Sequence, residues 1–90
     1  PMAGQDLRHL AGDAPRVMVV DGSKLVRKLI CDTLLRELPS AEVIGCAGLE
    51  EARATLAQGA VDLVTTALVL PDGDGLAVAR AVREAAGQAY

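Results

Sequence analysis

The stretch from residue 62 to residue 75 reads DLVTTALVLPDGDG, an apolar run followed by turn-forming residues. Its apolar first part predicts a strand and its exit over 61–70. Pro71 then begins a segment of turn-forming residues, so we expect a loop over 71–75. A helix is predicted over 76–86, where apolar residues recur at helical spacing: Leu76, Val78, Ala79 and Val82. Together these segments make one strand–loop–helix unit.

Two similar units precede this one. The first joins a strand over 16–20, RVMVV, to a helix over 24–38 that begins after the capping residue Ser23. The second joins a short strand over 42–47 to a helix over 49–58. The apolar positions of these two helices are Leu25, Val26, Leu29, Ile30, Leu34, Leu35 and Leu38, and then Leu49, Ala52 and Leu56. Alternating strands and helices predict an α/β fold with a parallel sheet.

The composition indicates one small domain with an aliphatic core. Of the 90 residues 51% are apolar, and the chain has no Phe, no Trp and a single Tyr. The net charge of −3 and the near absence of aromatic residues argue against direct contact with nucleic acid. No apolar run reaches the ~18 residues of a membrane helix, so we expect no membrane contact and a cytoplasmic location.

The amino-terminal segment and the cysteines complete this outline. We expect residues 1–15 to form a flexible arm, with Pro1 as the remnant of a cleaved tag, and residues 16–90 to form the domain. Cys31 and Cys46 make no metal-binding pattern with the single His. We expect both to be buried or half-buried free thiols.

The candidate functional residues lie where strands end. Asp21 and Gly22 directly follow the first strand, and Ala67 lies near the end of the third. In parallel sheets the carboxyl ends of the strands share one edge, and ligand sites form there. The sequence therefore predicts that Asp21, Gly22 and Ala67 lie close together.

Two segments resemble the receiver domain of bacterial response regulators. Residues 62–75 are similar to the third strand and following loop of that family, with matches at Pro71, Asp74 and Gly75. The segment VVDGSKLVRKLI, residues 19–30, is similar to its first strand and first helix. The resemblance covers about Arg16 to Ala86, and it implies a flavodoxin-like fold with three βα units and strand order 2-1-3.

The resemblance also implies a chemistry that this chain has lost. In receivers an aspartate at the position of Ala67 accepts a phosphoryl group, and two adjacent acidic residues help to hold Mg²⁺. Here Asp21 remains, but its neighbour is Gly22, and a methyl group at Ala67 cannot attack phosphorus. We therefore interpret these three residues as a degenerate phosphoacceptor pocket, without catalysis or cofactor beyond weak binding of Mg²⁺ at Asp21.

This interpretation predicts a non-phosphorylatable signalling module that regulates the output domain of a longer two-component-type protein by protein contact or dimerisation. One alternative is a genuine phosphoacceptor receiver in which an aspartate was deliberately changed to Ala67. Gly22 and the pair Thr65–Thr66 also depart from the receiver pattern, and three departures favour natural loss. A second alternative is a small nucleotide-binding α/β domain.

A receiver has five βα units, and these residues supply three, so we interpret the domain as truncated after the third. The edge of the third strand, Leu63 to Ala67, is then expected to leave backbone groups unpaired. The first helix is expected to expose part of its stripe at Leu25, Leu29 and Leu35. We therefore expect a protein partner or a second copy to cover the third-strand edge or the first helix, most simply in a homo-oligomer.

Overall fold

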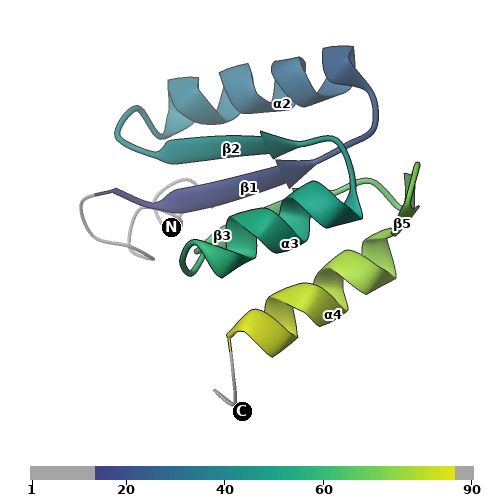
Figure 1. The fold of residues 1–90 in the computed structure, drawn as a ribbon. Coiled ribbons are helices and arrows are strands. Elements are labelled where there is room, and N and C mark those ends of the chain that lie inside the picture. The colour runs from purple at the N-terminus through teal and green to yellow at the C-terminus, as the bar shows by residue number, and fades with distance from the viewer. Residues whose placement is uncertain (1–13, 87–90) are drawn as a thin grey trace.

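The computed structural model describes residues 14–86 (Figure 1). Its elements are β1 (Arg16–Val20), α2 (Lys24–Glu37), β2 (Glu42–Cys46), α3 (Leu49–Ala57), β3 (Leu63–Thr66), β4 (Val69–Leu70), β5 (Gly73–Asp74) and α4 (Gly75–Ala85). The arm predicted over 1–15 lies outside the described residues up to residue 13. Within 14–86, none of the helices is long and apolar enough to cross a membrane.

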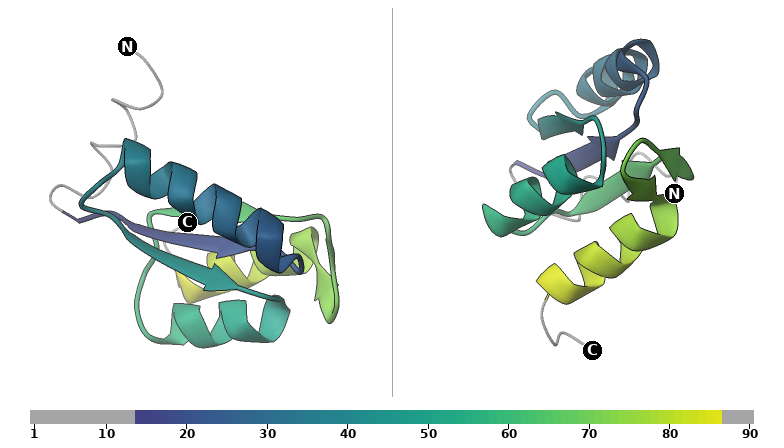
Figure 2. Two further views of the ribbon diagram at one scale, coloured as in Figure 1. Left: turned by 90° about the horizontal axis from the view of Figure 1, so that it is seen from above. Right: turned by 45° about the vertical axis from the view of Figure 1, so that its right-hand side comes forward.

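The three long strands form one parallel sheet in the order β2-β1-β3, which confirms the predicted fold class and strand order. In the central strand, Val20 lies opposite Cys46 of β2 and Thr66 of β3. Helix α2 covers one face of the sheet, and α3 and α4 cover the other (Figures 1 and 2). The carboxyl ends of β1, β2 and β3 therefore meet at one edge.

The core fills the space between the sheet and the pair α3 and α4. Met18 and Val20 of β1 pack there with Cys46 of β2. The helices contribute further buried residues: Ala52, Leu56, Val78 and Ala81. Val17 and Val19 are also fully buried. Because side chains alternate along a strand, β1 is enclosed on both faces, as its uninterrupted apolar run predicts.

The first helix exposes part of its predicted apolar stripe, as expected for Leu25, Leu29 and Leu35. None of the 14 residues of α2 is buried, and Leu25 and Leu29 are 68% and 58% exposed. A helix that rests on one sheet covers a narrow part of its own surface, whereas the stripe is wide. On α4, Val78 is buried as expected, but Leu76 of the predicted stripe is 65% exposed.

The third strand ends earlier than predicted. β3 stops at Thr66. Val69–Leu70, in the predicted strand exit, pairs antiparallel with Gly73–Asp74, in the predicted loop. Ala67 N still donates to Val20 O of β1, and directly afterwards a backbone hydrogen bond of 2.9 Å from Gly75 N to Leu68 O closes the loop. A single apolar run in the sequence therefore contains both the half-buried strand β3 and the first strand of a small hairpin.

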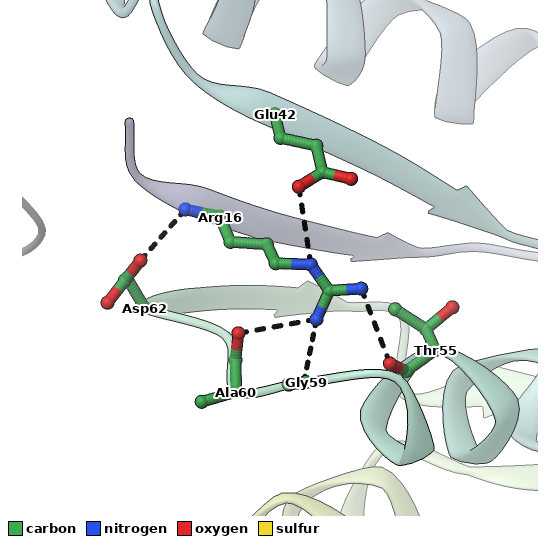
Figure 3. A network of polar contacts seen from close by, with 6 residues as sticks. All are labelled: Arg16, Glu42, Thr55, Gly59, Ala60 and Asp62. Atoms are coloured by element: carbon green, nitrogen blue, oxygen red, sulfur yellow. Dashed lines mark hydrogen bonds and ion pairs between the residues drawn. The ribbon is translucent and has the colours of Figure 1, made fainter. Parts of the chain in front are cut away.

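Arg16 connects the start of β1 to the neighbouring elements (Figure 3). Its backbone N–H donates to Asp62 Oδ2 at 2.8 Å, and its Nε lies 3.4 Å from Glu42 Oε1. Its guanidinium donates to three backbone carbonyl oxygens after the middle of α3, those of Thr55 (3.4 Å), Gly59 (2.7 Å) and Ala60 (3.3 Å). A single side chain thus ties β1 and β2 to the connection between α3 and β3.

Candidate functional site

The carboxyl edge of the sheet brings together the residues that follow β1 and β3. Ala67 N donates a hydrogen bond of 2.8 Å to Val20 O, and Asp21 N donates one of 3.0 Å to Cys46 O. Asp21 and Ala67 therefore leave adjacent parallel strands at the same level. The structure places Asp21, Gly22 and Ala67 at one edge, as the strand pattern predicts.

Asp21 has a structural use in the turn before α2. Its Oδ1 accepts a hydrogen bond of 2.8 Å from Ser23 N, and its carbonyl accepts one of 2.8 Å from Arg27 Nη1. Ser23 in turn caps the helix, because its Oγ accepts from Val26 N at 3.2 Å. The carboxylate is thus engaged in holding the β1–α2 turn, and Arg27 is a supporting residue that the sequence reasoning missed.

Gly22 lies beneath the loop that follows β3. A Cβ atom added at Gly22 would lie 3.1 Å from Pro71 Cδ and 3.8 Å from Ala47 O. Any side chain at position 22 therefore has to displace the Pro71 ring by a few tenths of an ångström. Pro71 thus has a physical role in the motif, since its ring packs the loop against the β1–α2 turn, while Leu70 belongs to the core.

Ala67 is half-buried at the start of this loop, and Gly75 closes it. A Cβ atom at Gly75 would lie 2.9 Å from Ala67 O and 3.3 Å from Leu68 Cα, so any larger residue forces the backbone apart. Asp74 precedes this glycine and caps α4, because its Oδ1 accepts from Ala77 N at 2.8 Å. The Asp-Gly pair thus serves the local geometry of the loop.

The residues present offer few ligands to the magnesium ion that the resemblance implies. Of the three pocket residues Asp21 alone carries a carboxylate, and its Oδ1 already accepts from the backbone. Within the described part of the chain, His, Cys, Asp and Glu form no group of three or more that could hold a metal. Both cysteines are free, and burial raises the pKa of the Cys31 and Cys46 thiols, which disfavours the metal-binding thiolate.

Asp72 is the residue of this edge that sequence reasoning missed. It comes from the turn between β4 and β5, and its carboxylate accepts hydrogen bonds from Leu49 N at 2.7 Å and Glu50 N at 3.0 Å. These are the first backbone amides of α3, whose capping residue Gly48 has no side chain to satisfy them. The sequence signal was Gly48, which cannot cap α3 with a side chain and so indicates that another group does. The sequence could not show which acid supplies that cap.

These hydrogen bonds lead to a prediction about acid pH. The backbone N–H groups of Glu50 and Leu49 favour the charged carboxylate and hold the pKa of Asp72 below its ordinary value of 3.8. The stabilisation is therefore present above the unfolded pKa and is lost as the pH falls through the lower folded pKa. An NMR titration of the Asp72 carboxyl carbon is expected to give a midpoint below 3.8, and a midpoint at or above that value would contradict the contact.

An open groove of about 380 Å³ lies beside this contact. Its lining residues are Ala47, Gly48, Glu50, Glu51, Ala54, Pro71 and Asp72. Neither Asp21 nor Ala67 lines it, so the hollow at this edge lies on the α3 side of the loop and away from the predicted pocket.

The sheet order and the loop at its carboxyl edge define a receiver-like α/β domain. No family model matches the chain. It is 44% identical over 71 residues to a protein-glutamate methylesterase/protein-glutamine glutaminase of Nocardioides sp., with 76% of this chain and 19% of that protein covered. It is 42% identical over 72 residues to the corresponding protein 2 of Cereibacter sphaeroides, with 79% and 20% covered. The chain thus spans about a fifth of the length of these curated relatives.

Proposed function

We propose that this receiver-like domain is a non-phosphorylatable signalling module that acts through protein contacts. The position of Ala67 carries the proposal. Its backbone N–H donates a hydrogen bond to Val20 O, next to Asp21. The resemblance places the acceptor carboxylate at position 67, and this chain has a methyl group there. Gly22 supports the same conclusion, because it supplies no second acid for a metal ion. Signalling at this edge then depends on shape and not on a transferred phosphoryl group.

The output that we propose for this module is a protein-glutamate methylesterase. The similarity to proteins of that name at 42–44% identity supports this proposal. The receiver-like domain would then act in chemotaxis signalling in the cytoplasm, as a regulatory part and not as the esterase itself. A methylesterase assay on the full-length protein, with and without residues 14–86, tests the regulation. Equal activity of the two forms would contradict it.

Incubation with acetyl phosphate and magnesium is expected to leave the intact mass of the protein unchanged. The physical reason is that Ala67 supplies no nucleophile and that Asp21 alone holds Mg²⁺ weakly. Mass spectrometry of the intact chain measures the result, with a phosphoaccepting receiver treated in parallel as the control. A gain of one phosphoryl group that maps to Asp21 or to the neighbouring edge would overturn the proposal.

For the mode of contact we propose association through the β3 edge or through α2. Among the described residues β3 pairs with β1 alone, so its outer edge offers unpaired backbone groups. Leu25, Leu29 and Leu35 of α2 are 68%, 58% and 42% exposed. Both surfaces suit a second copy of the chain, because an edge strand can pair with itself across a two-fold axis. A protein partner with an exposed strand or an apolar helix suits them as well.

The 90-residue chain is therefore expected to be a dimer or larger oligomer in light scattering. Ala67 N donates toward β1, so by alternation the N–H of Thr66 points to the outer edge. Thr66→Pro is expected to weaken association through β3, and Leu29→Glu association through α2. A well-folded monomer at high protein concentration would contradict self-association. Each variant is the control for the other, because it leaves the other proposed surface unchanged.

A further inference from the structure

The geometry points to Asp72 as the residue that holds the carboxyl edge of the sheet in one arrangement. We call its pair of hydrogen bonds with α3 the latch. We define the edge loop as residues 67–75, which connect β3 to α4. The Asp72 carboxylate fastens this loop to the first turn of α3, a separate element of the fold. This role rests on the proposed function, since a module that signals by shape needs an edge of fixed shape.

The contact is a two-point attachment. The two carboxylate oxygens of Asp72 accept from two successive backbone amides, those of Leu49 and Glu50, at 2.7 Å and 3.0 Å. Both amides lie in the first turn of α3, where a helix has no internal acceptors for them. The positive end of the helix dipole also favours an anion there. Glu51 holds the same turn from the other side, because its Oε1 accepts from Ala47 N at 2.9 Å.

Three glycines let the edge loop approach this closely. A Cβ atom at Gly48 would overlap Asp72 Oδ1, and one at Gly73 would lie 2.9 Å from Leu49 Cδ2. The third is Gly75, where a Cβ atom would meet Ala67 O. Side chains at any of these positions would push the loop away from α3 or strain its own closure. Gly48 and Gly73 thus permit the contact with α3, and Gly75 permits the loop to close on Ala67.

The edge loop is held from its other side as well. The Pro71 ring packs on Gly22 in the β1–α2 turn, and the carboxylate of the next residue, Asp72, accepts a hydrogen bond from α3. The loop therefore spans the carboxyl edge from the end of β1 to the start of α3. Movement of the loop away from α3 requires both carboxylate contacts to break.

Amide hydrogen exchange followed by NMR tests the latch in the intact chain. The test variant is Asp72→Asn, in which the neutral amide offers one acceptor oxygen and turns a donor toward the helix. Exchange at Leu49 and Glu50 is expected to become about tenfold faster or more, and exchange at Gly75 in the loop is expected to rise as well. Exchange at Val19 in β1 is expected to stay unchanged.

Asp74→Asn is the matched control, because it makes the same change two residues along the loop. Asn is as good a helix cap as Asp, so exchange at Leu49 and Glu50 is expected to stay at the wild-type rate. The latch is overturned if Asp72→Asn leaves Leu49, Glu50 and Gly75 unchanged, or if it speeds Val19 equally. These measurements use no phosphodonor, so their outcome is independent of the phosphorylation test. Unchanged exchange rates would overturn the latch even if the chain resists phosphorylation, and phosphorylation of the chain would overturn the proposed function even if the exchange rates rise.

Discussion

Replacement of Arg16 by Met is expected to lower the free energy of unfolding by about 1–2 kcal/mol. Met keeps most of the apolar stem but removes the guanidinium that serves the carbonyl oxygens of Thr55, Gly59 and Ala60. The Arg16 side chain is 18% exposed and the Thr55 carbonyl is part-buried, so water replaces that donor incompletely, whereas it can reach the exposed carbonyls of Gly59 and Ala60. The loss is a large share of the stability of a domain this small.

Urea unfolding followed by circular dichroism measures this effect as a shift of the midpoint at constant slope. Arg16→Lys retains the charge but offers a single ammonium group, and an intermediate loss is expected because one point donor cannot reach all three carbonyls. Arg53→Met, at an exposed position of α3, is the control and is expected to change stability by less than ~0.5 kcal/mol. Equal effects of Arg16→Met and Arg53→Met would show that the network does not stabilise the fold.

Ala67→Asp alone is expected to restore phosphorylation poorly, and Ala67→Asp together with Gly22→Asp is expected to restore it at least about tenfold better. The single carboxylate would face Asp21 without a well-held cation, and like charges raise one pKa and repel the phosphodonor. A second acid at position 22 helps to hold Mg²⁺. The structure adds a condition, because the new side chain must displace the Pro71 ring, 3.1 Å from the added Cβ.

The phosphorylated fraction after incubation with acetyl phosphate and magnesium measures this prediction by intact mass. Gly22→Asp alone is the control, and it is expected to show no phosphorylation because Ala67 remains. Circular dichroism of each variant checks that the new acids leave the fold intact. If the single variant at position 67 reacts as fast as the double variant, Gly22 has no part in the loss of function.

The sheet and the placement of the candidate residues followed from the sequence because they depend on strand order. Once three apolar strands alternate with helices, a parallel sheet places Asp21 and Ala67 at the same edge. The exposure of Leu25, Leu29 and Leu35 on α2 was also expected. The exposure of Leu76 on α4 did not follow, because periodicity shows which side chains share a helix face but not how much of that face is covered. The cap of α3 by Asp72 did not follow either. Asp72 is 23 positions from Leu49 and 22 positions from Glu50, and local sequence patterns do not show which distant residues meet.

The remote cap of α3 has a consequence for the way in which the chain folds. The first amides of α3 find their acceptor in a turn that is made after β3. A helix of nine residues is too short to be stable alone, so α3 depends on contacts made later in the chain. The second and third strand–helix units are therefore expected to form together in one cooperative step, and a nascent chain that stops before residue 72 would carry an unfinished α3.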